Sequence, residues 1–287
     1  MRRFRLTARG RVVAGRSEEN VMEDVMKTRC DHPGDTRGAA WSRREIFRTA
    51  GTVGTGAALA SLGLARLADP AAAQAPLKIG VIGAGRIGAT LGELWVKAGH
   101  EVLLSSRHPE NLRDLAARLG PRARAGAPRE AAAFGEVIMI AVPYGALPQV
   151  GRDLAGEMQG KIVLDAANPF PSRDGPMAEE ARKKGTGIAN AEYLPGVRLV
   201  RAFNTIPYGV LRSQPHRAGA RIAVPLAADD RAALEVAARL VRDAGFEPVV
   251  VGPLSRAKEF DAGTPVFGKG LTAAELRQGL GLGTPGR

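Results

Sequence analysis

Residues 78–107 read KIGVIGAGRIGATLGELWVKAGHEVLLSSR. A short apolar run, Leu77–Ile82, leads directly into glycines spaced as G-x-G-x-x-G, and a helical pattern, Arg86–Ala98, follows. This order is typical of a dinucleotide-binding fold, in which a tight glycine turn lets a pyrophosphate rest on the helix N-terminus. The alternative is a purely structural turn, which requires neither the strand before it nor the helix after it. The predicted cofactor contacts in the turn are Gly83, Ala84, Gly85, Arg86, Ile87 and Gly88.

The end of the second apolar run indicates which dinucleotide is bound. Glu101–Ser105 is followed by Ser106 and Arg107, where an NAD-specific site usually has an acidic residue that holds the ribose 2′-hydroxyl. A hydroxyl and a guanidinium suit a 2′-phosphate instead. The sequence therefore predicts NADP(H), with Ser106 and Arg107 at the 2′-phosphate. The alternative is that Arg107 is an ordinary solvated arginine.

Strand and helix patterns alternate through the rest of the chain. Further strands are expected at Val137–Val142, Ile162–Ala166, Arg198–Phe203, Ala220–Ala227 and Phe246–Val251. Further helices are expected at Pro109–Leu119, Ala127–Phe134, Ala146–Gly156, Asp229–Ala244 and Leu271–Leu280. Such alternation predicts an α/β fold with a Rossmann-type, doubly wound parallel sheet.

The same order gives the expected domains. We expect a leader at residues 1–75, an NADP-binding Rossmann domain at 76–187, and a small C-terminal α/β region at 188–287 that completes the acceptor site. Residues 168–187 are rich in Pro, Gly and charge, so we expect a loop over the site there.

Candidate ligand contacts follow three of the expected strands, because ligands bind at the carboxyl ends of parallel strands. Ala141 and Pro143 end one strand and would lie near the nicotinamide ribose. Asn168 would hydrogen-bond the carboxamide or the ribose, or it starts the turn into Pro169. Asn204 would face the nicotinamide and the second substrate, or it caps the next helix.

Acid–base groups are scarce in the expected site. His100 lies in the turn before the second strand, His108 lies beside the proposed phosphate-binding arginine, and His216 lies in a polar loop. None belongs to a recognisable acid–base constellation, no catalytic residue is identified, and no metal site is expected. Hydride transfer between two cofactor rings needs mainly positioning. The pattern therefore favours a cofactor-to-cofactor reductase.

The first 75 residues have the order of an export signal. Arg43 and Arg44 precede an uncharged run, Thr49–Ala65, and a small-residue run, Ala71–Ala75, while the only cysteine is Cys30. This order resembles a twin-arginine signal, so we expect contact with the twin-arginine export machinery and a periplasmic or extracellular location. The alternative is a basic tail on a cytoplasmic enzyme. The uncharged run is too weakly apolar to predict a stable membrane span.

The formal net charge of +12 is spread along the chain. It forms no dense basic tract interleaved with aromatic residues. We therefore expect no nucleic-acid partner, and the spread charge suits a domain that binds anionic nucleotides.

The motifs taken together resemble a known family. VIGAGRIG, the helix after it and the VLLSSR ending are similar to the NADPH:F420 oxidoreductases, as are RAFNTIP at 201–207 and GPLS at 252–255. Residues 190–194, followed by RAFNTI, also resemble the cytoplasmic domain of the six-transmembrane metalloreductases, which passes hydride from NADPH to a flavin. The similarity spans nearly all of residues 77–256.

This resemblance implies an NADP-dependent oxidoreductase that transfers hydride between NADPH and a flavin, an F420-like deazaflavin or another small acceptor. It implies nicotinamide-side contacts near Ala141, Pro143, Asn168 and Ala202. The alternatives are a non-catalytic NADP-binding module that senses redox state and a small imine or hydroxyacid reductase. The oligomeric state is left open, with a homodimer as one candidate.

Two parts of the chain depart from that family. The glycine loop has Ala84 and Arg86 where a Thr/Ser–Asn pair is often found. Residues 256–270, RAKEFDAGTPVFGKG, replace an apolar helical end. In the resembling family that end helps shape the deazaflavin and dimer surfaces, so the second departure bears on whether F420 is the acceptor.

Overall fold

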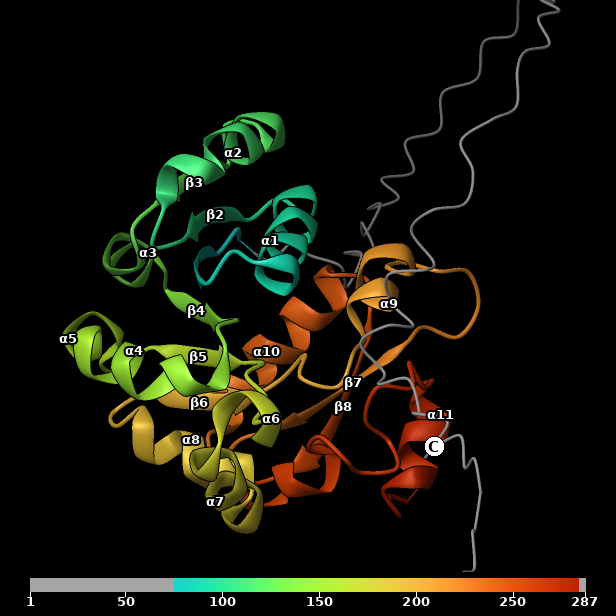
Figure 1. The fold of residues 1–287 in the computed structure, drawn as a ribbon. Helices are drawn as coiled ribbons and strands as arrows, with labels where there is room; N and C mark the ends of the chain where they lie inside the picture. Colours follow the sequence, from blue (N-terminus) through green and yellow to red (C-terminus); the bar gives the residue numbers. More distant parts are fainter. Residues whose placement is uncertain (1–74, 284–287) are drawn as a thin grey trace, which may run out of the picture. The chain divides into compact units, whose positions relative to one another are not determined.

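One mixed β-sheet forms the centre of the fold. The computed structural model describes residues 75–283, and the expected twin-arginine pair and Cys30 lie outside the described residues. Within them the strand order is β3-β2-β1-β4-β5-β6-β7-β8 (Figure 1). The strands are β1 (Lys78–Ile82), β2 (Glu101–Ser105), β3 (Ala123–Gly126), β4 (Val137–Ile140), β5 (Ile162–Asp165), β6 (Arg198–Arg201), β7 (Ala223–Ala227) and β8 (Glu247–Gly252).

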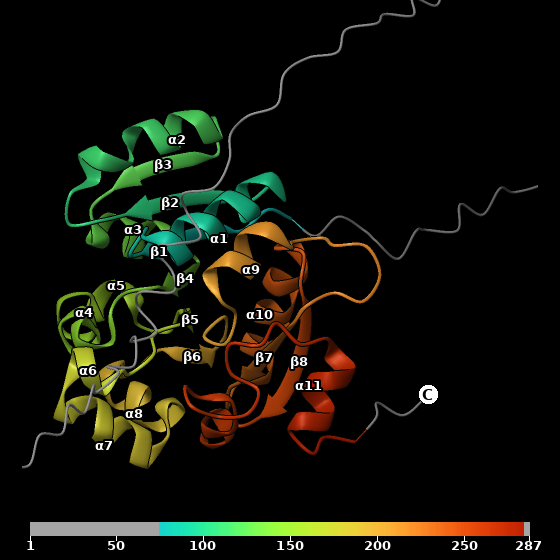
Figure 2. The ribbon, with the colours of Figure 1, turned by 45° about the vertical axis from the view of Figure 1, so that its right-hand side comes forward.

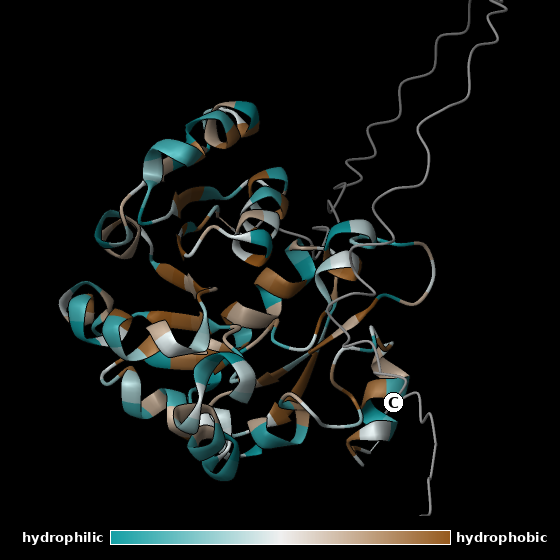
Figure 3. Ribbon diagram, viewed as in Figure 1, coloured by the Kyte–Doolittle hydropathy of each residue, from teal (hydrophilic) through white to brown (hydrophobic). Residues whose placement is uncertain are grey.

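The central strands are buried on both faces. In β4, Val137 and Met139 join one hydrophobic cluster, while Ile138 and Ile140 join another on the opposite face. This division follows from the two-residue period of a strand. The continuous apolar run is what a parallel strand covered on both sides requires. Accordingly, the strands are hydrophobic and the outer helix faces are mixed or hydrophilic (Figure 3).

Helices pack against both faces of the sheet (Figures 1 and 2). One face carries α1 (Arg86–Lys97), α9 (Tyr208–Ser213) and α10 (Arg231–Asp243), whose buried residues share a cluster. In that cluster Trp95 meets Phe203 edge to face at 6.0 Å and donates its indole N–H to the Leu240 carbonyl at 2.9 Å. The opposite face carries α3 (Pro128–Phe134), α4 (Leu147–Asp153), α5 (Ala155–Met158), α7 (Pro176–Lys184) and α8 (Thr186–Tyr193).

The remaining helical segments lie around the edges. They are η2 (Pro109–Leu112), α2 (Arg113–Leu119), η3 (Tyr144–Ala146), α6 (Pro171–Asp174), η4 (Leu254–Phe260) and α11 (Ala273–Gly279). Residues of η4 and α11 form a third hydrophobic cluster with β7 and β8. Thr272 and Glu275 cap α11 reciprocally, which explains where it begins. No helix within residues 75–283 is long and apolar enough to cross a membrane.

The sheet changes direction between β6 and β7. Neighbouring strands from β3 to β6 pair parallel, but β7 pairs antiparallel with β6 through Arg201 and Ala227. Each of these residues is the last of its strand, so β7 and its parallel neighbour β8 extend past the carboxyl ends of the parallel strands. The chain therefore leaves β8 near the carboxyl end of β6. The next segment, η4, begins at that same edge of the sheet.

These observations confirm the Rossmann-type α/β prediction, with one exception in strand direction. The sequence patterns indicated a parallel sheet throughout, and β7 is antiparallel to β6. Strands from both expected domains belong to the one sheet, and the boundary at residue 187 stays a prediction.

The prediction of a loop at residues 168–187 is wrong. The segment contains α6, α7 and the beginning of α8. Pro171 and Pro176 occupy first-turn positions, where a helix has no use for their missing N–H. The sequence of α7 resembles a loop because the helix buries only two small residues, Ala178 and Ala181.

Candidate functional site

The glycine turn between β1 and α1 has three glycines with three different roles. Gly83 has a φ of +92°, and a Cβ there would lie 2.7 Å from the Ala141 carbonyl oxygen. A Cβ at Gly88 would lie 2.3 Å from the Gly83 carbonyl oxygen. At Gly85 a Cβ would meet nothing within 4 Å. The first and third glycines are therefore required by the fold, whereas the second leaves open space in front of the helix.

The N-terminus of α1 faces that open space without a capping side chain. Gly85 is the N-cap residue and makes no side-chain hydrogen bond, and the first intrahelical donor is the Ala89 N–H, 2.8 Å from the Gly85 oxygen. The N–H groups of residues 86–88 precede that donor and have no partner within the helix. Uncapped N–H groups and the positive end of the helix dipole bind phosphate. The turn therefore fits a dinucleotide pyrophosphate.

A cavity of about 640 Å³ opens at this turn. Its lining includes seven of the predicted site residues, namely Gly83, Ala84, Gly85, Ser106, Arg107, Ala141 and Pro143. Val150 of α4 and Leu154, which follows α4, contribute apolar side chains to its lining. The structure thus brings together the glycine turn, the end of β2 and the end of β4.

The predicted phosphate-binding pair lines this cavity. The Ser106 hydroxyl accepts the His108 N–H at 3.1 Å, and the Ser106 N–H donates to the Gly126 carbonyl at 3.4 Å. Arg107 is exposed and lines the cavity. A flexible guanidinium beside a fixed hydroxyl suits a doubly charged phosphate ester.

Six predicted contacts do not line this cavity. Arg86 lies at the start of α1 and lines a separate cavity of about 470 Å³. Gly88 and Ala202 are buried, and Ile87 is half-buried. Asn168 and Asn204 form a second polar region at the ends of β5 and β6.

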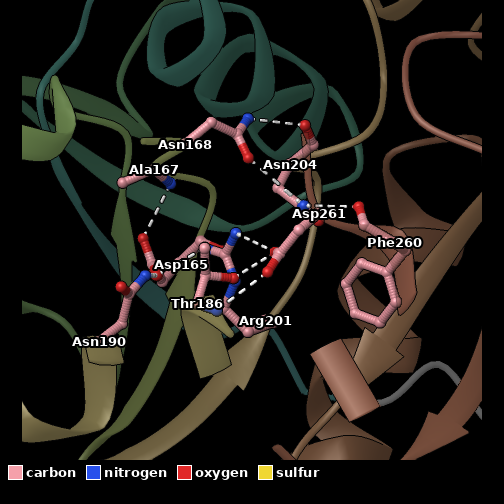
Figure 4. Close-up of polar contacts among 9 residues, drawn as sticks. All are labelled: Asp165, Ala167, Asn168, Thr186, Asn190, Arg201, Asn204, Phe260 and Asp261. Carbon is pink, nitrogen blue, oxygen red and sulfur yellow. Dashed lines mark hydrogen bonds and ion pairs between the residues drawn. The ribbon is translucent and has the colours of Figure 1, made fainter. Parts of the chain in front are cut away.

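Asn168 and Asn204 are joined by hydrogen bonds between the two strand ends (Figure 4). The Asn168 side-chain amide donates to the Asn204 carbonyl at 2.8 Å. The Asn204 amide donates to the Phe260 carbonyl at 3.2 Å. The Asn204 Oδ1 atom is buried and has no partner among the described residues, so it fits a ligand N–H. The alternative of a helix cap is wrong, because Pro207 precedes α9 and provides no side-chain cap.

Beneath these amides lies a charged network that the sequence analysis missed (Figure 4). Arg201 and Asp165 are fully buried, and Arg201 Nη1 donates to Asp165 Oδ2 at 2.6 Å. The same guanidinium lies 3.8 Å from Asp261 through Nη2. Asp261 also accepts the Thr186 N–H at 2.9 Å and the Thr186 hydroxyl. We call Asp165, Thr186, Arg201 and Asp261 the buried charge network.

Two further groups surround the buried charge network. The Asn190 amide donates to Asp165, and Asp165 also accepts the Ala167 N–H at 2.9 Å. Tyr144 is fully buried beside Tyr193, and burial raises the pKa of the Tyr144 phenol above its usual value. Tyr144 therefore stays protonated. One sequence signal could have identified this network. Each of two apolar strands ends in a charged residue, Asp165 in IVLD and Arg201 in RLVR.

The side chains of His100, His108 and His216 take no part in either region. His100 accepts the Leu77 N–H at Nδ1 (3.0 Å) and donates from Nε2 to Asp243 (3.0 Å). Burial lowers the pKa of His100 despite the nearby carboxylate. His108 is exposed beside Glu110, and His216 is exposed in a loop. Among residues 75–283 no cluster of His, Cys, Asp or Glu is arranged to hold a metal ion.

This geometry has counterparts among known proteins. Residues 78–169 match the family model described as NADP oxidoreductase coenzyme F420-dependent. The chain is 30% identical over 196 residues to Metalloreductase STEAP3 of Rattus norvegicus, which covers 66% of this chain and 36% of that protein. It is 29% identical over 207 residues to F420-dependent NADP reductase of Methanothermobacter thermautotrophicus, which covers 67% of this chain and 88% of that protein.

A solved structure also aligns with the chain. A hypothetical protein from Sinorhizobium meliloti superimposes with a TM-score of 0.58 at 27% identity, which covers 69% of this chain and 96% of that one. The chain spans about a third of the length of the metalloreductases that it matches and most of the F420-dependent NADP reductase. Together the matches support the family resemblance and an NADP-dependent oxidoreductase.

Proposed function

We propose that this protein is an NADP-dependent oxidoreductase that moves hydride between NADP(H) and a flavin, a deazaflavin or a similar small acceptor. The observation that carries the proposal is that the glycine turn and the Ser106–Arg107 pair line one cavity. An open helix N-terminus and a guanidinium at the end of the second strand are the two anion sites that NADP requires. The matched family and the F420-dependent NADP reductase support the same cofactor.

Each region of the site has a separate role in this proposal. The N–H groups at the start of α1 bind the pyrophosphate, and Ser106 and Arg107 bind the 2′-phosphate. Asn204 Oδ1, which has no protein partner in the described region, accepts an N–H from the nicotinamide carboxamide. Asn168 holds the Asn204 backbone in place. Bound NADPH supplies the hydride, and the protein provides orientation and a dry environment rather than an acid or base.

The test of cofactor choice is the substitution Arg107→Gln. We expect KM for NADPH to rise by about tenfold or more, because a charge-assisted phosphate contact contributes about 1.5–3 kcal/mol, while KM for NADH changes little. Arg118→Gln removes an equally exposed arginine outside the cavity lining and is the matched control. Equal use of NADH and NADPH by the unsubstituted protein would contradict the assignment.

Catalysis itself is tested with flavins as acceptors. NADPH oxidation with FMN or riboflavin supports the oxidoreductase and excludes a non-catalytic redox sensor. A protein whose Tm is not raised by NADP⁺, and which oxidises no NADPH, lacks the proposed function.

We also propose that the leader directs export through the twin-arginine machinery. The proposal rests on Arg43, Arg44 and the small-residue run before Pro76. Mass spectrometry of the protein recovered from outside the cytoplasm would give an N-terminus near residues 74–76, and Arg43→Lys with Arg44→Lys would abolish export. Full-length protein retained in the cytoplasm of the unsubstituted strain would contradict it.

A further inference from the structure

Residues 256–270, which depart from the resembling family, are bonded to the chain that leaves β6. The Phe260 carbonyl accepts the Asn204 side-chain amide at 3.2 Å (Figure 4). The Gly268 N–H donates to the Thr205 carbonyl at 3.0 Å. Two consecutive residues beyond β6 are therefore held by this segment, one through its side chain and one through its backbone.

The bond to Phe260 decides which atom of the Asn204 amide is left for a ligand. A carbonyl oxygen accepts hydrogen bonds and cannot donate them, so Asn204 meets it with Nδ2. The same Nδ2 lies 3.4 Å from Asn168 Oδ1, which is also an acceptor. Asn204 Oδ1 is the remaining atom, and it is buried without a partner among residues 75–283. Because an unmet buried acceptor costs free energy, the site favours a ligand that brings an N–H.

The peptide unit that carries the Phe260 carbonyl is held at both ends. Because a peptide unit is planar, the direction of its carbonyl follows from the residues that it joins, Phe260 and Asp261. The Phe260 ring is fully buried in the third hydrophobic cluster. The Asp261 carboxylate accepts the Thr186 N–H and the Thr186 hydroxyl, and it lies 3.8 Å from Arg201. The Asp261 side chain thus ties the orientation of the Phe260 carbonyl to α8 and β6.

The alternative role for Asp261 is to balance the buried charge of Arg201. Asp165 already gives Arg201 a close partner at 2.6 Å. Asp261 is farther away at 3.8 Å, and Arg201 Nη2 has no hydrogen-bond partner in the described part of the chain. The hydrogen bonds of the Asp261 carboxylate come instead from Thr186. The geometry therefore favours a carboxylate that fixes a position over one that supplies a counter-charge.

We propose that Asp261 is a positioning residue for the nicotinamide end of the cofactor. By holding the Phe260 carbonyl, it makes Asn204 present its oxygen, and this selects a nicotinamide that carries a carboxamide N–H. The inference rests on the proposed oxidoreductase function and deepens its cofactor assignment. Asp261 acts through Phe260 and Asn204, and it takes no part in the hydride transfer.

The test compares NADP⁺ with its 3-acetylpyridine analogue, in which a methyl group replaces the carboxamide NH₂. Titration calorimetry gives the Kd of each. We expect the unsubstituted protein to bind NADP⁺ about tenfold more tightly than the analogue, because the analogue leaves the Asn204 oxygen unmet. Asn204→Ala removes that oxygen, so its preference should fall to about one.

Two substitutions at Asp261 separate positioning from charge balance. Asp261→Leu accepts no hydrogen bond from Thr186, and the preference for NADP⁺ should fall to about threefold or less. Asp261→Asn is uncharged, but its amide oxygen still accepts the Thr186 N–H and its NH₂ can donate to the Thr186 hydroxyl. It should therefore keep a preference of about fivefold or more.

A stability control and a second pair of variants accompany this test. Val241 is fully buried on α10, in the cluster on the opposite face of the sheet, so Val241→Ala should lower Tm and leave the preference unchanged. If Asp261→Leu does not fold, the same comparison is made at Thr186. Thr186→Val should then lower the preference, and Thr186→Ser should keep it.

The outcomes separate this inference from the proposed function. A preference near one in an unsubstituted protein that binds NADP⁺ and oxidises NADPH overturns the inference, and the oxidoreductase stands. Equal losses in Asp261→Leu and Asp261→Asn make Asp261 a counter-charge and also overturn it. The same holds if Val241→Ala loses as much preference as Asp261→Leu, because destabilisation alone then explains the effect. A protein that neither binds NADP⁺ nor oxidises NADPH contradicts both.

Discussion

The glycine turn and the buried charge network are both polar, but one consists of unpaired backbone groups and the other of paired side chains. The turn is made of backbone, and its polar N–H groups face open space because Gly85 has no side chain there. The network is made of charged side chains that are buried and bonded to one another, with Arg201 between Asp165 and Asp261. The first region leaves polar groups free for a ligand. The second uses protein partners to keep the strand ends in place.

The largest expected effect is on the network side of this comparison. Arg201→Met leaves Asp165 and Asp261 buried without their cation, and we expect a loss of about 3–5 kcal/mol in the free energy of unfolding. Arg198→Met is the matched control on the same strand, because Arg198 and its partner Asp230 are about one-third exposed and such pairs contribute at most about 1 kcal/mol. Urea titration measures both variants. Similar losses in the two would remove the distinction between buried and surface charge.

The next effect separates two glycines within the turn. Gly88→Ala places a methyl group against the Gly83 carbonyl and should cost about 1–3 kcal/mol of stability. Gly85→Ala has space and a φ of −76°, so its stability should change by less than about 0.5 kcal/mol. The Kd for NADP⁺ should nevertheless rise by about tenfold in Gly85→Ala. Unchanged NADP⁺ binding in Gly85→Ala would place the pyrophosphate elsewhere.

A smaller effect is expected at Thr186, which links α8 to the network. Thr186→Val keeps the shape and removes the hydroxyl that donates to Asp261, so the buried carboxylate loses one donor. We expect a loss of about 1–2 kcal/mol, measured by thermal and urea unfolding. Thr186→Ser keeps the donor and should recover most of that loss. A Ser variant no more stable than the Val variant would mean that packing, not the hydrogen bond, matters there.

The smallest effect concerns pH and lies outside both regions. Burial lowers the pKa of His100 below its usual 6.5, so the unfolded state binds more protons as the pH falls through that value. The free energy of unfolding should therefore decrease from about pH 7 to about pH 5. His100→Gln should flatten this dependence, whereas His108→Gln, an exposed control, should not. An unchanged slope in His100→Gln would assign the pH dependence to other groups.

The turn could be predicted from sequence because its requirements are local. Three glycines within six residues, a strand before them and a helix after them already determine the backbone path. The ends of β2, β4, β5 and β6 could be placed at one edge for the same reason, since each follows an apolar run. Ser106, Arg107, Asn168 and Asn204 could therefore be assigned to that edge, and their roles as ligand contacts stay predictions.

The network could not be predicted because its members meet only in the folded chain. Thr186 and Asp261 are 75 residues apart in sequence, and Asp165 and Arg201 are 36 apart. Two errors had the same origin. The loop expected at residues 168–187 hid the helix that carries Thr186, and the expected parallel sheet hid the reversed β7 and β8 that bring Asp261 to Arg201.

The single residue pair between β6 and β7 has a consequence for cooperativity. On the α1–α10 face one hydrophobic cluster runs from β1 to β7, whereas on the other face the clusters around β4–β6 and around β7–β8 are separate. On that second face they are connected by the buried charge network and by η4, which places Leu254 in one cluster and Ala257 and Phe260 in the other. Unfolding in one step therefore depends on this connection together with the continuous cluster on the α1–α10 face. When it is broken, amide exchange in β7, β8 and α11 should become faster than exchange in β1 and β4, so that one cooperative unit divides into two.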